Sequence, residues 1–136
     1  MAINFNGRVA IVTGAGGGLG RQHALALAAR GAKVLVNDLG SGVHGEGGSV
    51  SPAQAVVDEI RAAGGEALAN GASVTDFAAV EAMVQQAIDA WGRVDILVNN
   101  AGILRDKSFA KMSMDDFNLV VQVHLMGAAH CCKAVW

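Results

Sequence analysis

The sequence predicts an α/β fold, a doubly wound parallel sheet with helices on both faces. Short β-branched runs alternate four times with longer stretches of helical periodicity, the pattern that gives parallel strands joined by right-handed crossovers. Runs such as "RVAIVT" and "KVLVND" are apolar at consecutive positions, which indicates strands covered on two sides. Five glycines also fall within the eight residues from Thr13 to Gly20, between the first run and the first helical stretch.

The elements follow in order along the chain. The predicted strands cover residues 8–13, 33–38, 66–71 and 94–100. Helices are predicted over 18–30, 52–63, 77–91 and from 113 to the last residue, Trp136. Residues 39–50 are polar and rich in glycine, so we expect a loop there.

Local signals support the helix limits. Gly31 and Gly92 follow helical stretches, as glycine does where a helix ends. Ser51 can accept from free helix amides, and Pro52 at the first helical position loses no hydrogen bond. Ser113 has the spacing of a capping box with an acidic residue three positions later. The last helix carries an apolar stripe of Phe117, Val120, Val121, Leu125 and Ala128.

Composition narrows the possible functions. The 136 residues suffice for one domain with a core. Charged residues make up 16% and the formal net charge is −2, so we expect a small-molecule substrate and neither a nucleic acid nor a membrane as partner. No targeting segment is recognisable in "MAINFNGR", which predicts a cytoplasmic protein. Cys131 and Cys132 lack metal-ligand spacing, so we expect buried reduced thiols and no metal.

The glycine cluster has a chemical explanation. A helix N-terminus presents unpaired N–H groups and a partial positive charge, and glycine lets a pyrophosphate approach that backbone. The G-x-G-x-x-G spacing fails because Leu19 stands where the third glycine would be. The spacing T-G-x-x-x-G-x-G does fit, with Thr13, Gly14, Gly18 and Gly20. A tight strand-to-helix turn without a ligand is the alternative.

Asp38 adds a second signal. It stands at the carboxyl end of the second predicted strand, 18 residues after Gly20, where a carboxylate can accept hydrogen bonds from both hydroxyls of an adenosine ribose. The same charge would repel a 2′-phosphate, and no Arg or Lys lies in the glycine turn or directly after Asp38. The cofactor expected is therefore NAD. The alternative is a solvated loop carboxylate.

These residues resemble the short-chain dehydrogenase/reductase family along the whole chain. "TGAGGGLG" resembles the family's cofactor turn, Asp38 its NAD-selecting acid, and "NNAG" at 99–102 the segment that lies along the cofactor. The resemblance implies a Rossmann fold with strand order 3-2-1-4, Asn100 beside the adenosine ribose, and Asn99 supporting the central sheet. The cofactor-binding residues expected are Gly14, Gly18, Leu19, Gly20, Asp38, Ser73, Val74, Asn100, Ala101 and Gly102.

Within the family, "VNDLGSG", "NNAGILRDKSF" and "VHLMG" look most like the (3R)-hydroxyacyl-CoA dehydrogenase part of peroxisomal multifunctional enzymes and their bacterial relatives. That resemblance implies oxidation of a 3-hydroxyacyl thioester. Two positions depart from the wider family. Ser73 and Val74 stand where an Asp-Val pair usually contacts adenine, and His124 stands where a catalytic Asn is usual. His124 is therefore a candidate for proton relay or for holding a water, with a packing role as the alternative.

The family's proton-transfer groups are missing from this sequence. It contains no Tyr, although the family uses a Tyr with a Lys four residues on and a Ser on a neighbouring strand. We therefore expect the amino-terminal part of a longer single-domain enzyme, with a sheet truncated to four strands, inactive alone and prone to form homo-oligomers. The alternatives are a non-catalytic NAD-binding module and an assembly module.

Overall fold

The computed structural model of the chain describes residues 2–40 and 51–136, so most of the loop predicted over 39–50 lies outside the described residues. Four strands form one parallel sheet in the order β3-β2-β1-β4. They are β1 (Val9–Val12), β2 (Lys33–Asn37), β3 (Ala67–Asn70) and β4 (Ile96–Val98). This confirms the predicted fold class and strand order, and β4 is shorter than the run 94–100 suggested.

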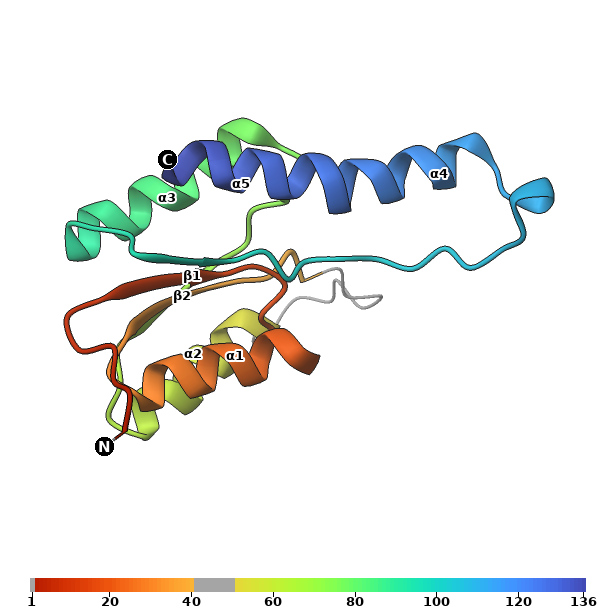
Figure 1. Cartoon of the computed structure of the whole chain (residues 1–136). Coiled ribbons are helices and arrows are strands. Elements are labelled where there is room, and N and C mark those ends of the chain that lie inside the picture. The colour runs from red at the N-terminus through yellow and green to blue at the C-terminus, as the bar shows by residue number, and fades with distance from the viewer. Residues whose placement is uncertain (1, 41–50) are drawn as a thin grey trace.

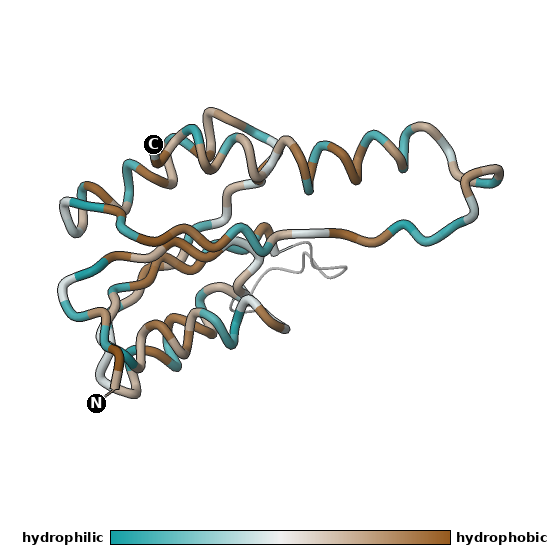
Figure 2. Tube along the Cα trace, viewed as in Figure 1, coloured by the Kyte–Doolittle hydropathy of each residue, from teal (hydrophilic) through white to brown (hydrophobic). Residues whose placement is uncertain are grey.

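Two helices cover each face of the sheet (Figure 1). One face packs on α1 (Gly18–Ala29) and α2 (Pro52–Ala62), and the other on α3 (Phe77–Trp91) and α5 (Gly127–Val135). Side chains alternate along each strand, so β1 sends Ala10 and Val12 to the first layer but Val9 and Ile11 to the second. The middle parts of the strands are accordingly mostly hydrophobic (Figure 2).

The predicted helix limits are confirmed where the sequence carried a local signal. Ser51 Oγ accepts the N–H of Gln54 at 3.1 Å and so caps α2. Gly92 ends α3 with a φ of 80°. Ser113 Oγ likewise accepts the N–H of Asp116 at 3.1 Å. The Asp116 carboxylate pairs with Arg105, so the structure shows one half of the expected capping box.

The last helix is not regular along its length. It begins as α4 (Met114–Val121), continues through a π-helical turn at Gln122–Met126, and ends as α5. In the π-helical turn the N–H of Gly127 donates to the carbonyl of Gln122, five residues back. Together these segments form one long rod, of which α4 projects beyond the sheet (Figure 1). The sequence predicted the helix but not the π-helical turn.

The cysteines differ in their surroundings, which corrects the expectation that both are buried. Cys131 lies in the core between the sheet and α3, whereas Cys132 is exposed. Adjacent residues of a helix point about 100° apart, so α5 can turn only one of the two thiols to the core. Among the residues that the structure describes, no helix has the length and hydrophobicity needed to span a membrane.

Candidate nucleotide-binding site

The predicted site residues come together at the carboxyl edge of the sheet. Thr13 follows β1, Asp38 follows β2, and Asn100 follows β4. The next strand along the chain, β2, pairs on one side of β1, and the last strand, β4, pairs on the other side. Ligands of open α/β sheets bind at such a reversal of strand order, outside the carboxyl ends of the strands.

Thr13 joins the ends of β1 and β4. Its buried hydroxyl oxygen accepts the N–H of Asn100 at 3.1 Å and the N–H of Ala101 at 3.0 Å. The hydroxyl lies 3.4 Å from the carbonyl oxygen of Val98, to which it donates. One threonine side chain thus holds the start of the segment 99–102 against the glycine turn.

Gly14 and Gly20 are required by close packing. Gly14 has a φ of +62°, and a Cβ there would lie 2.8 Å from the Cα of Ala101. At Gly20, a Cβ would collide with the Gly14 carbonyl oxygen and with the Asn100 amide nitrogen. These contacts give the predicted spacing of Gly14 and Gly20 a structural reason.

The N-terminus of α1 is open to a ligand. Its N-cap residue, Gly17, has no side chain that could cap the helix, and the first turn contains no acidic residue. A Cβ built at Gly17 or Gly18 would meet nothing within 4 Å among the described residues. Leu19 lies beside them and is 74% exposed. Free amides, helix dipole and open space together suit an anionic group.

Asp38 lies across from this turn. Its Oδ2 accepts the N–H of Gly16 at 2.9 Å, and its Oδ1 accepts the N–H of Gly40 at 2.8 Å. A Cβ at Gly16 would lie 2.7 Å from Oδ2, so Gly16 is needed where the predicted spacing left it unassigned. Each oxygen retains lone pairs with which it can accept from a ligand hydroxyl.

Arg21, in the first part of α1, is already engaged. Its Nε and Nη2 donate to the two carboxylate oxygens of Glu59 on α2. A bidentate pair of this kind fixes the direction of the guanidinium. The positive charge of Arg21 is therefore directed at α2.

Ser73 and Val74 form the turn between β3 and α3. The Ser73 hydroxyl lies 2.7 Å from the hydroxyl of Thr75, so its hydrogen bond stays within the turn. Val74 is buried, and it packs so tightly on α5 that a Cβ at Gly127 would lie 2.6 Å from its Cγ2.

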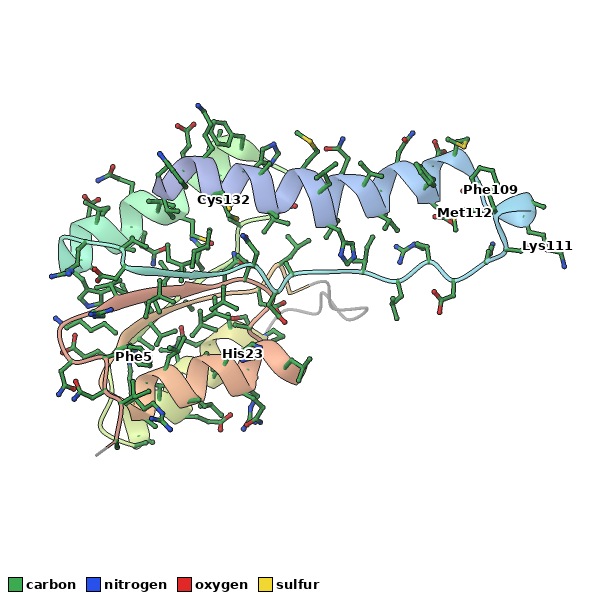
Figure 3. All side chains as sticks on the ribbon, viewed as in Figure 1. Phe5, His23, Phe109, Lys111, Met112 and Cys132 are labelled. Carbon is green, nitrogen blue, oxygen red and sulfur yellow. The ribbon has the colours of Figure 1, made fainter. Side chains whose placement is uncertain are left out.

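The two asparagines of "NNAG" have different partners. The Asn100 amide donates to the carbonyls of Thr13 at 3.0 Å and Gly14 at 3.1 Å, so Asn100 holds the glycine turn. Asn99 is exposed and its amide contacts Cys132 Sγ at 3.4 Å; Figure 3 shows Cys132 on α5. This corrects the expectation that Asn99 supports the central sheet, because its side chain faces α5. The cofactor contact of Asn100 stays a prediction.

His124 lies in the π-helical turn, next to the end of "NNAG". Its Nε2 is 2.9 Å from the carbonyl oxygen of Ile103 and 3.0 Å from the nitrogen of the same residue. Gly102 makes this approach possible, since a Cβ there would lie 2.7 Å from His124 Cε1. His124 also borders a pocket of about 140 Å³ that reaches Thr13 and Asn99. A catalytic role for His124 stays a prediction.

A four-stranded parallel sheet with a glycine turn after its first strand and an acid after its second defines a Rossmann-type domain. A family model described as short chain dehydrogenase matches residues 8–136. The chain therefore belongs to the short chain dehydrogenase family, whose Rossmann fold binds nicotinamide cofactors.

Individual relatives agree with the family. Identity to peroxisomal multifunctional enzyme type 2 of Drosophila melanogaster is 58% over 134 residues, which cover 98% of this chain and 22% of that enzyme. Identity to a 3-oxoacyl-acyl-carrier-protein reductase of Synechocystis sp. is 44% over 128 residues, or 94% of this chain and 49% of that one. The crystal structure of a short chain dehydrogenase from Mycobacterium avium superimposes on this chain with a TM-score of 0.88 and 52% sequence identity. The match covers 95% of this chain and 45% of the Mycobacterium avium chain. The chain thus spans about half, or less, of the length of these relatives.

Proposed function

We propose that this chain forms the cofactor-binding part of an NAD-dependent oxidoreductase that interconverts a secondary alcohol and a ketone. The observation that carries the proposal is the position of Asp38, whose two carboxylate oxygens accept from Gly16 and Gly40 beside the open N-terminus of α1. A carboxylate held in this way needs no rearrangement to accept hydrogen bonds from a ribose.

The residues present fit a dinucleotide without an added phosphate. The amides of Gly17 and Gly18 would bind the pyrophosphate, since none of the described residues occupies the space where their Cβ atoms would be. Asp38 would accept from the ribose hydroxyls and repel a 2′-phosphate. Arg21 is directed at Glu59 and so does not offset that repulsion. The proposed cofactor is therefore NAD.

When bound, NAD supplies a hydride acceptor for alcohol oxidation. The chain's own part is to bind and orient the dinucleotide through the glycine turn, Asp38, the turn at Ser73 and Val74, and the segment 100–102. The sequence contains no Tyr, so the proposed proton-transfer groups lie outside these 136 residues, and the chain alone is proposed to be inactive. His124 is proposed to assist as a proton relay or by holding a water near the "NNAG" segment.

The proposed substrate class is a 3-hydroxyacyl thioester. The resemblance of "VNDLGSG", "NNAGILRDKSF" and "VHLMG" to dehydrogenases of that specificity supports it. The name of the Synechocystis relative, a 3-oxoacyl-acyl-carrier-protein reductase, supports the same class because 3-oxoacyl and 3-hydroxyacyl thioesters are the two sides of one redox pair.

Calorimetric titration of the chain with NAD and with NADP tests the cofactor. We expect NAD to bind more tightly than NADP. Asp38→Ala should weaken NAD binding by roughly 10- to 100-fold, since hydrogen bonds to a charged group contribute about 1.5–3 kcal/mol. The variant should also show a smaller preference for NAD over NADP. Asp58→Ala, on the exposed surface of α2, is the control and should leave both affinities unchanged. The proposal would be contradicted if the wild-type chain bound NAD and NADP with equal affinity. It would also be contradicted if Asp38→Ala bound NAD as tightly as wild type.

A further inference from the structure

His130 on α5 makes two contacts with the region around Val74. Its Nδ1 lies 2.8 Å from the carbonyl oxygen of Val74. Its ring also packs on that of Phe77, the first residue of α3, with centroids 5.4 Å apart and planes at 43°. A carbonyl oxygen only accepts hydrogen bonds, so Nδ1 must carry the proton. His130 therefore connects α5 to the turn before α3 by a directed bond.

Among the described residues, the turn makes few other hydrogen bonds to α5. The Ser73 hydroxyl bonds to Thr75, and the N–H of Asp76 bonds to the carbonyl of Ser73, so both interactions are internal to the turn. Within the described residues, the hydrogen bond from His130 is the one that joins a carbonyl of this turn to α5. Beneath it, Gly127 allows Val74 to lie against the same helix.

We infer that His130 is a positioning residue for the adenine end of the cofactor site. This inference rests on the proposed function, in which Ser73 and Val74 border the adenine. The Ser73 hydroxyl is engaged with Thr75, so the backbone of the turn is the polar group proposed to face the base. His130 fixes that backbone through the Val74 carbonyl, and the N–H of Val74 has no acceptor within the described part of the chain.

The position of His130 also depends on the irregular helix. One π-helical turn adds a residue between α4 and α5 and so rotates all that follows. That turn ends at Met126, directly before Gly127, and His130 follows one helical turn later. The same π-helical turn carries His124. The π-helical turn therefore positions both His124, beside "NNAG", and His130, which holds the turn at Val74.

Two substitutions at His130 separate the hydrogen bond from the ring. His130→Phe keeps an aromatic ring against Phe77 but removes the donor, whereas His130→Asn restores a donor at the place of Nδ1. Titrated with NAD and with ADP-ribose, His130→Phe should bind both roughly 3- to 10-fold more weakly, as expected for one lost hydrogen bond. His130→Asn should recover most of that loss. Nicotinamide mononucleotide, which lacks the adenosine, should bind wild type and His130→Phe equally.

His23→Phe is the matched control, because His23 lies on α1, in the helix layer on the other face of the sheet from α5 (Figure 3). Unchanged NAD affinity in His130→Phe, or an equal loss for nicotinamide mononucleotide, would overturn the inference. Hydrogen exchange of the unliganded protein gives a readout that does not depend on NAD. In His130→Phe the amides of Thr75 and Asp76, which donate within the turn, should exchange several-fold faster, and those of α2 at the wild-type rate.

These readouts keep the two proposals apart. If wild type binds no NAD while exchange in the turn responds as expected, the proposed function fails and the hydrogen bond of His130 stands without its role at adenine. If wild type binds NAD and the turn exchanges at the same rate in His130→Phe, the inference about His130 fails and the proposed function stands.

Discussion

Cys131 and Cys132 are adjacent residues whose thiols lie in different surroundings, one buried and one exposed. Cys131 is fully buried among apolar side chains, and burial, with a smaller contribution from the neighbouring Cys132, raises the pKa of its thiol to about 11. Cys132 lies at the surface, where its sulfur meets the amide of Asn99. Since the thiolate is the reactive form, the two thiols should differ in reactivity.

We expect iodoacetamide at pH 8 to alkylate Cys132 and to leave Cys131 unmodified in the folded protein. At that pH a thiol with a pKa of about 11 is ionised to roughly one part in a thousand, and burial also blocks access. Fragmentation mass spectrometry locates the label. Cys132→Ser should remain unlabelled until denaturant is added, and rapid labelling of that variant in buffer would contradict the structure.

The residues around Asp38 show how far sequence reasoning reached. Asp38 was identifiable because an acid after the second strand has a known use in such sheets. Gly16 was not, because its requirement comes from the Asp38 carboxylate on another strand's end. His130 gave no sequence signal either, since a single histidine on a helix has no spacing to mark it and its partner is a backbone carbonyl.

At the scale of elements, the junction of β1 and β4 determines the shape of the site. The Thr13 hydroxyl accepts from the N–H groups of Asn100 and Ala101, and the Asn100 amide donates back to the carbonyls of Thr13 and Gly14. The glycine turn and the "NNAG" segment are therefore held as one unit.

Replacing Thr13 by Val should destabilise the protein by about 2–4 kcal/mol, because two backbone N–H groups lose their acceptor at a buried position. Urea denaturation followed by circular dichroism measures the change. Thr13→Ser keeps the hydroxyl and should cost about 1 kcal/mol for the lost methyl group. If Thr13→Val and Thr13→Ser destabilise the protein equally, the hydroxyl is not the group that joins the two strands.

The helices show which elements a sequence can define. Capping and C-terminal signals at Ser51, Gly92 and Ser113 act within a few residues, and each was identified correctly. The π-helical turn was missed because no residue type requires it. Within this turn His124 contacts Ile103, which lies 21 residues earlier in the chain, so the contact cannot be inferred from local sequence.

At the scale of the whole molecule, a charge pair ties the start of the sheet together. Asp95, just before β4, accepts the N–H of Val9 on β1 at 2.9 Å and pairs with Arg93. The hydrogen bond from Arg93, then that from Val9, holds the pKa of the Asp95 carboxyl below its ordinary value. A carboxyl whose pKa is lower in the folded state stabilises that state above its unfolded pKa, and the contribution disappears as pH falls through the folded pKa.

Asp95→Asn should therefore be less stable than wild type at neutral pH. The difference in free energy of unfolding should decline below about pH 4, where the unfolded-state carboxyl titrates. Denaturation curves of both proteins between pH 7 and pH 2.5 measure it. Arg93→Gln removes the larger cause of the lowered pKa but keeps the hydrogen bond from Val9. At neutral pH its free energy of unfolding should therefore differ from that of wild type by less than that of Asp95→Asn does. A difference that stays constant over the whole range would show that the pair does not contribute in this way.

The rod formed by α4, the π-helical turn and α5 is the largest departure from a compact shape (Figure 1). Its apolar stripe is partly uncovered, with Phe117 41% and Leu125 64% exposed. Phe109, Lys111 and Met112 lie near its far end (Figure 3). The expected homo-oligomer would cover such a stripe, and it stays a prediction.

NAD is proposed to bind at the carboxyl edge of this sheet. Nitrogen–proton correlation spectra of the labelled chain, recorded while NAD is added, test whether NAD binds and locate its site. We predict saturable shifts of the amides of Gly17, Gly18, Gly40 and Val74. The amides of Gly64 and Gly65, at the opposite edge of the sheet, should stay in place. No shift at saturating NAD, or shifts confined to that opposite edge, would contradict NAD binding at this site.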